Sequence, residues 1–207
     1  LLGALHAEGT DCYRLFHGAS EGWPGVAVDR YGPVLLVQTW GVALSDAALD
    51  LVSSAVSGAL GLGTDLALVW RERVHAPHTR VADPGAPAPR PTDPRLDAPI
   101  GRELGLAYDV RPVHAGQDPL LFLDLRAGRR RVRSHAADES VLNLFAYTCG
   151  IGVCAAAGGA SEVWNVDFAA SALAVGRANA ERNGVASETF RLVREDVIPV
   201  VRQLAGL

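Results

Sequence analysis

The chain has 207 residues, enough for one compact domain or two small ones with a sizeable buried core. Hydrophobic residues make up 49% of it, charged residues 20%, and no run of eighteen apolar residues occurs, so we expect a soluble globular protein rather than a disordered or membrane-spanning one. The net charge is −4, and all cationic residues are arginines, so contact with nucleic acid would need a local basic patch.

The three cysteines, Cys12, Cys149 and Cys154, contain no CxxC pair and have no histidine cluster nearby. A disulfide framework is therefore not expected, and we predict no metal site. No basic segment followed by an apolar one opens the sequence, so no secretory signal is expected. These features favour a reducing, cytoplasmic compartment.

The first part of the chain predicts a small mixed α/β unit. Residues 25–30 alternate in polarity, Tyr31-Gly32-Pro33 is typical of a turn, and residues 34–40 are apolar, which together indicate a β-hairpin. Ser45 and Asp46 predict the start of a helix that ends near Gly61. Residues 66–70 predict a further strand.

A proline-rich stretch divides the sequence. Residues 76–99 hold seven of the twelve prolines, and proline fixes φ and removes a backbone donor, so we expect an exposed loop. We predict a first domain over residues 1–118, which contains this loop, and a second over residues 119–207.

The second part predicts strands that alternate with helices. We expect a strand at 106–113, a helix at 124–137, and then strands at 141–145, 162–166 and 189–193 with helices at 152–157, 169–183 and 197–204. Such alternation indicates parallel β-α-β crossovers. The predicted fold class is therefore α/β, with part of a Rossmann-like sheet.

The segment NLFAYTCGIG at residues 143–152 joins the first of these parallel strands to a helix, where such folds bind their ligand. Asp167 ends the next strand and could accept both hydroxyls of a ribose. Asp196 follows the third strand and could contact an adenine amino group. The segment lacks the G-x-G-x-x-G pattern that a dinucleotide requires, so S-adenosylmethionine is the preferred ligand. Alternatively, Gly150 and Gly152 serve only close helix packing.

Five arginines lie within eight residues, at positions 126, 129, 130, 131 and 133. On a helix, Arg126, Arg130 and Arg133 share one face and could contact successive RNA phosphates. The alternative is a solvated helix face that pairs with neighbouring carboxylates.

Three stretches carry a family resemblance: FHGASEGWPGVAVDRYG near the N-terminus, LFLDLRAGRRRV, and VLNLFAYTCGIGVCAAAGGASEVWNVDFAASAL. In this order they resemble the bacterial class I S-adenosylmethionine-dependent methyltransferases of 23S ribosomal RNA, several of which act at cytosine C5. Members have a PUA domain, a central α/β domain and a Rossmann domain. The resemblance implies S-adenosylmethionine as cofactor, ribosomal RNA as substrate, and a central domain followed by part of a class I methyltransferase sheet.

Residue by residue, the resemblance extends the candidate site. The expected cofactor-binding residues are Phe145, Tyr147, Thr148, Cys149, Gly150, Asp167, Phe168, Asp196, Asp124 and Arg126, and the expected RNA-binding residues are Arg129, Arg130 and Arg133. Cys149 stands where the family has a glycine. Leu125 and Gly128 stand where it has amide side chains.

In the family, the D-P-P motif and the nucleophilic cysteine of the cytosine-C5 enzymes follow the third parallel strand, and this sequence ends before them. We therefore assign no catalytic residue and expect the chain alone to be inactive. Three hypotheses remain: an RNA methyltransferase or part of one, a non-catalytic RNA- or cofactor-binding module, and, least favoured, a nucleotide-dependent oxidoreductase. A three-stranded parallel sheet leaves an open edge, so we also expect self-association, for example as a homodimer.

Overall fold

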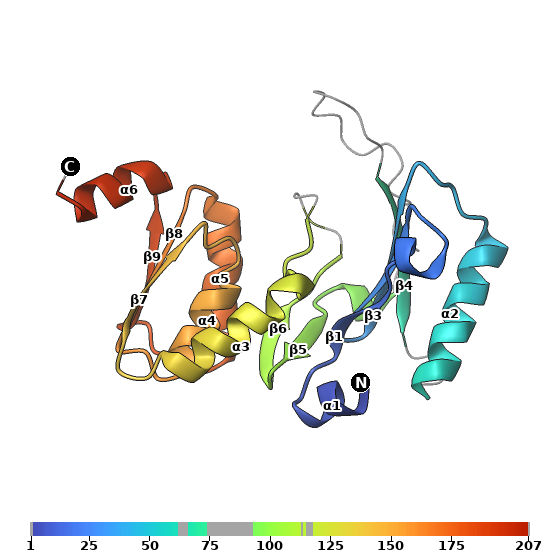
Figure 1. Ribbon diagram of the computed structural model, residues 1–207, viewed down its shortest axis with the longest axis horizontal. Coiled ribbons are helices and arrows are strands. Elements are labelled where there is room, and N and C mark those ends of the chain that lie inside the picture. The colour runs from blue at the N-terminus through green and yellow to red at the C-terminus, as the bar shows by residue number, and fades with distance from the viewer. Residues whose placement is uncertain (1, 62–65, 74–92, 113, 115–117, 207) are drawn as a thin grey trace. The chain divides into compact units, whose positions relative to one another are not determined.

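The computed structural model describes residues 2–61, 66–73, 93–112, 114 and 118–206 (Figure 1). The chain forms two compact units: the first comprises Leu1–Arg102 and Val110–Pro119, the second Glu103–Asp109 and Leu120–Leu207. Residues 103–109, which the sequence places in the first domain, thus belong to the second unit. Most of the predicted proline-rich loop, residues 76–92, lies outside the described residues. Its last part contains a 3-10 turn, η2 (Pro94–Leu96).

The first unit contains a four-stranded sheet with the order β1-β2-β3-β4. Its elements are α1 (Leu2–Ala7), β1 (Cys12–Phe16), the 3-10 turn η1 (Ala19–Glu21), β2 (Val26–Tyr31), β3 (Val34–Trp40), α2 (Asp46–Leu60) and β4 (Ala67–Arg73). The first three strands are antiparallel, and β4 is parallel to β3. The predicted hairpin, helix and following strand are confirmed, whereas α1 and β1 are additional elements.

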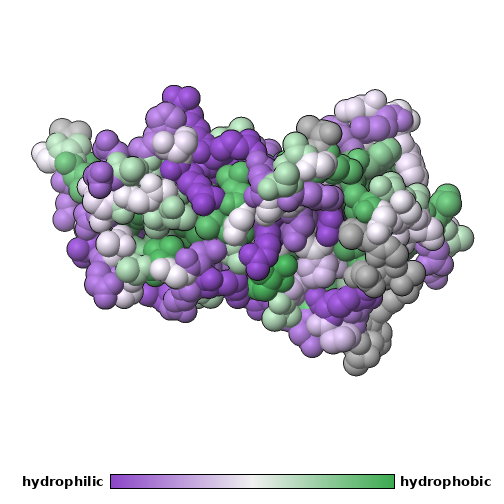
Figure 2. Space-filling model, turned by 90° about the horizontal axis from the view of Figure 1, so that it is seen from below, coloured by the Kyte–Doolittle hydropathy of each residue, from purple (hydrophilic) through white to green (hydrophobic). Residues whose placement is uncertain are grey.

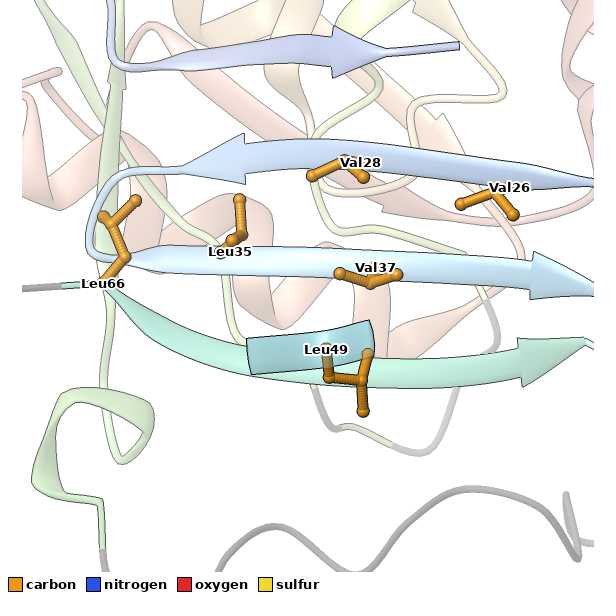
Figure 3. Packing of buried hydrophobic residues seen from close by; sticks show 6 residues of the cluster. All are labelled: Val26, Val28, Leu35, Val37, Leu49 and Leu66. Carbon is orange, nitrogen blue, oxygen red and sulfur yellow. The ribbon is translucent and has the colours of Figure 1, made fainter. Parts of the chain in front are cut away.

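Helix α2 begins and ends at the residues that the sequence indicates. The Ser45 hydroxyl accepts a hydrogen bond from the Ala48 N–H, and Gly61 ends the helix at a φ of 64°. Figure 3 shows the core of the first unit, formed by buried side chains from β2, β3, α2 and the residue before β4: Val26, Val28, Leu35, Val37, Leu49 and Leu66. Alternate residues of β2 and β3 thus share one face of the sheet, which is the face that this core occupies.

Truncation of this core should destabilise the first unit. Leu35→Ala removes a fully buried side chain and should lower the free energy of unfolding by about 2–5 kcal/mol, because it leaves a cavity. The control is Leu51→Ala on α2, where the side chain is 71% exposed. Urea unfolding compares the two variants, and equal losses would contradict the assigned core.

Strand β5 (Ile100–Glu103) belongs to the first unit up to Arg102, and the second unit continues from Glu103 into β6 (Leu106–Asp109). The further elements of the second unit are the 3-10 turn η3 (Leu123–Leu125), α3 (Arg126–His135), β7 (Ser140–Leu144), α4 (Gly150–Ala157), β8 (Glu162–Asp167), α5 (Ala170–Arg182), β9 (Phe190–Arg194) and α6 (Val197–Leu204). Strands β7, β8 and β9 are adjacent and parallel. Helices α4 and α5 lie against one face of this sheet (Figure 1). The predicted Rossmann-like arrangement is therefore present.

The other face of this sheet presents apolar side chains to solvent. Leu142 and Trp164 are exposed neighbours in the β7–β8 register. The Arg191 guanidinium lies 5.2 Å from the centre of the Trp164 ring and pairs with Glu162 at 2.7 Å. On the molecular face seen in Figure 2, hydrophobic residues lie in small groups among hydrophilic ones. No helix in the described part of the chain has the length and apolar character needed to cross a membrane.

Asn179 of α5 and Asn183, which directly follows α5, bind the backbone of β6. Asn183 accepts a hydrogen bond from the Ala107 N–H at 2.8 Å and donates to its carbonyl at 2.7 Å. Asn179 accepts from the Asp109 N–H at 2.8 Å. These amides take the place of a neighbouring strand, so backbone groups of β6 are satisfied by a helix.

Candidate functional site

The loop after β7 has an unusual backbone. Three of its residues, Phe145, Tyr147 and Cys149, have φ values of 54°, 49° and 58°, in the left-handed region that favours glycine. Each such residue costs free energy unless the surrounding structure holds it, and residues of this kind cluster at ligand sites. Two backbone hydrogen bonds hold this loop, from the Ala146 N–H to the Val166 carbonyl at 3.0 Å and from the Cys149 N–H to the Ala146 carbonyl at 2.7 Å.

Asp167 joins this loop to the one after β8. Its Oδ2 accepts a hydrogen bond from the Tyr147 N–H at 2.8 Å, and its Oδ1 accepts from the Ala169 N–H at 2.8 Å. The side chain is buried at the end of β8. A carboxylate has about four acceptor positions, so both oxygens retain acceptor capacity for the two hydroxyls of a ribose.

The rear of the loop is fixed by the segment before α3. The Thr148 hydroxyl donates to the Leu120 carbonyl at 2.5 Å, and the rings of Tyr147 and Phe122 lie 5.5 Å apart. Neither Leu120 nor Phe122 is among the predicted site residues. Phe122 lies in the LFLDLRAGRRRV stretch, which could have indicated it, whereas the backbone carbonyl of Leu120 leaves no signal in the sequence.

Two exposed aromatic residues follow adjacent strands. Phe145 comes directly after β7 and Phe168 directly after β8, and each is 73% exposed. Exposed large apolar side chains of this kind suit contact with a planar apolar ligand. Asp196, after β9, accepts a hydrogen bond from the Ile198 N–H and caps α6. Asp124 lies exposed in η3.

The two glycines of α4 have different roles. A Cβ added at Gly150 would meet only ordinary contacts with Leu121 and Arg129, so close packing does not demand glycine there. A Cβ at Gly152 would lie 2.0 Å from the Asn165 Oδ1, which accepts a hydrogen bond from Asn143. Helix packing therefore explains Gly152 and leaves Gly150 available to a ligand.

One arginine of the cluster, Arg129, is buried in the second unit. The Arg129 side chain is 2% exposed, its Nε lies 2.5 Å from the Glu103 Oε1, and its Nη2 donates to the Phe122 carbonyl at 2.6 Å. The prediction that Arg129 binds RNA is therefore wrong, because the guanidinium cannot reach a phosphate in solvent.

The other arginines of the cluster vary in exposure. Arg126 pairs with the same carboxylate at 3.0 Å, and Arg133 donates to the Leu104 carbonyl. Arg130 and Arg131 are exposed. The roles of Arg126 in cofactor binding and of Arg130 and Arg133 in RNA binding stay predictions. Glu103 is fully buried and more than twenty residues away from its partners in sequence, so local spacing could not identify it.

The buried thiols are poor nucleophiles. Burial, with a further contribution from the charge of Asp167, raises the pKa of Cys149 to about 12. Burial also raises the pKa of Cys154, whose sulfur lies 3.2 Å from the Tyr108 hydroxyl. Both thiols stay protonated at neutral pH, and the thiolate is the form that attacks an electrophile.

The Cys149 pKa should appear in the pH dependence of stability. The thiol ionises near pH 8.5 in the unfolded chain and near 12 in the folded one, so between these values the folded state binds more protons and the free energy of unfolding falls as the pH rises. Cys149→Ser should reduce this slope by up to about 1.4 kcal/mol per pH unit. Urea unfolding from about pH 8 to about pH 10 measures both chains, and identical slopes would refute the assignment.

Comparison with known proteins agrees with this geometry. Residues 95–198, half of the chain, match the family model of S-adenosylmethionine-dependent methyltransferases. The chain belongs to this family. The family assignment does not support the oxidoreductase hypothesis.

Individual relatives extend over nearly the whole chain. It is 33% identical over 198 residues to ribosomal RNA large subunit methyltransferase I of Klebsiella pneumoniae and 35% identical over 200 residues to a ribosomal RNA large subunit methyltransferase of Deinococcus radiodurans. Each match covers 95% of this chain and 48% of the relative, so the chain spans about half the length of these proteins. A methyltransferase solved in complex with SAH (S-adenosylhomocysteine) matches with a TM-score of 0.74 and 26% identity, over 98% of this chain and 50% of that one. The predicted α/β methyltransferase fold is therefore confirmed.

Proposed function

We propose that the chain supplies the cofactor-binding part of a cytoplasmic methyltransferase that acts on ribosomal RNA. The observation that carries this proposal is the Asp167 carboxylate, which bridges the two loops at the carboxyl edge of the sheet, each of which begins with an exposed phenylalanine. The second unit then forms the start of the methyltransferase domain and the first unit the central α/β domain. The similarity to ribosomal RNA methyltransferases favours this function over a non-catalytic module.

The residues at this edge suit S-adenosylmethionine, which when bound supplies an activated methyl group. Asp167 would accept hydrogen bonds from the ribose hydroxyls. Phe145 and Phe168 would contact the adenine ring, and Asp196 would contact the adenine amino group. The backbone at Tyr147, Thr148, Cys149 and Gly150 would line the methionine end, next to the first turn of α4, where a carboxylate is favoured. Asp124 and Arg126 complete the proposed set.

Loss of the Asp167 carboxylate should weaken cofactor binding. Asp167→Ala removes two proposed acceptors for the ribose and the acceptor of the Tyr147 N–H. Cofactor binding should therefore become less favourable by about 1.5–3 kcal/mol. Glu181→Ala, at an exposed position of α5, is the control. Calorimetric titration with S-adenosylhomocysteine measures both. Unchanged affinity in the Asp167 variant, with binding intact in the parent chain, would remove Asp167 from the site.

The exposed side of α3 is our proposed RNA contact. Arg130 and Arg131 are exposed residues of α3, and Arg133 lies on the same helix. Arginine suits phosphate because its forked donors match the phosphate oxygens.

Binding to ribosomal RNA fragments should therefore weaken steeply with salt, as phosphate contacts release counterions. The double variant Arg130→Ala/Arg131→Ala should bind more weakly and show a shallower salt slope, whereas Arg95→Ala in the first unit should not. Filter binding at increasing salt measures this, and salt-independent binding would contradict the role of α3.

For transfer to cytosine C5, the same RNA should acquire no methyl label from the chain alone, because that step needs a thiolate and the two thiols in the second unit stay protonated. Labelled RNA would show that the catalytic groups are misassigned.

We also propose that the chain self-associates as a homodimer. The exposed Leu142 and Trp164 side chains on the second unit's sheet support this, since apolar side chains on an exposed sheet face favour association. Sedimentation velocity should show a dimer whose population falls in Trp164→Ser. A monomer at all concentrations would exclude it.

A further inference from the structure

Asn179 occupies a central position in the second unit. The residue is fully buried on α5, and its amide contacts two separate segments. Its Oδ1 accepts a hydrogen bond from the Asp109 N–H of β6 at 2.8 Å, and its Nδ2 donates to the Thr148 carbonyl at 3.3 Å. Arg182 also donates to Oδ1, at 3.1 Å. One side chain therefore links the β6 strand to the loop of the candidate site.

The Thr148 carbonyl lies at the most strained part of that loop. It stands between Tyr147 and Cys149, both of which have left-handed backbone conformations. The Thr148 hydroxyl already holds the loop to Leu120 on one side, so the Asn179 amide is a second tether from the helix side. Without it, a buried carbonyl would lack this donor, and the loop could relax toward less costly backbone angles.

Gly176, also on α5, lies against the same loop. A Cβ added at Gly176 would lie 2.4 Å from the Cys149 sulfur. Gly176 and Asn179 are three residues apart and so share a face of the helix. The loop therefore meets α5 at two positions: the Cys149 thiol lies against Gly176, and the Thr148 carbonyl accepts a hydrogen bond from the Asn179 amide.

We propose that Asn179 is a positioning residue for the cofactor. It acts through Thr148, whose carbonyl it holds, and so keeps the Tyr147 N–H directed at Asp167. This inference rests on the proposed cofactor site. Asn183, four residues later at the C-terminal cap of α5, hydrogen-bonds to the β6 backbone, and it provides the matched comparison.

The experiment compares Asn179→Asp with Asn183→Asp. Each substitution keeps an acceptor for the β6 N–H and loses a donor, but only Asn179→Asp turns an oxygen toward the Thr148 carbonyl. Calorimetry with S-adenosylhomocysteine should show affinity lower by about tenfold or more in Asn179→Asp. Asn183→Asp should bind like the parent chain even where its free energy of unfolding is also reduced. Parent-like affinity in Asn179→Asp, or an equal loss in both variants, would overturn the proposal.

Hydrogen exchange without cofactor separates this inference from the proposed function. The Cys149 amide, which bonds to the Ala146 carbonyl, should exchange faster in Asn179→Asp and at the parent rate in Asn183→Asp. If the parent chain binds no S-adenosylhomocysteine, the proposed function fails while this comparison still decides whether Asn179 holds the loop. If Asn179→Asp does not fold, Asn179→Ser takes its place in both measurements. Failure of both variants to fold would contradict a role confined to positioning.

Discussion

The candidate site depends on one buried carboxylate. Asp167 ends β8 and accepts backbone hydrogen bonds from the loops that follow β7 and β8. Charged acceptors form stronger hydrogen bonds than neutral ones, so this group can offset part of the cost of the left-handed residues between Phe145 and Cys149. The same carboxylate faces the edge where a parallel sheet binds its ligand. Loop shape and the proposed ligand recognition are therefore linked through a single side chain.

The sequence predicts the second unit well because its signals are local. Alternating strands and helices, and the loop between Leu144 and Gly150, follow from polarity patterns and from residue types that match a family motif. The strand β1, by contrast, has little alternation of polar and apolar residues, so the sequence does not predict it. Strand β6 lies in the second unit and contacts α5, for example from Asp109 to Asn179, and such contacts link residues far apart in sequence.

The arginine cluster shows where reasoning from the sequence fails. A run of arginines on one helix resembles a phosphate-binding surface, but the Glu103 carboxylate pairs with the buried Arg129 and the partly buried Arg126. The buried Glu103 carboxylate needs these guanidinium partners, because an unpaired charge at a buried position would be strongly destabilising. Arg130 and Arg131 are exposed, whereas Arg129 is buried. The spacing of arginines in the sequence does not predict this difference.

The carboxyl edge of the β7–β9 sheet is the proposed cofactor site. Titration of the isotopically labelled chain with S-adenosylhomocysteine, followed through the amide resonances in NMR spectra, reports on each residue of this edge. We predict that the shifted resonances are those of residues 145–150 and 167–169, on either side of the Asp167 carboxylate. Shifts confined to the first unit, or none at saturating ligand, would contradict the account.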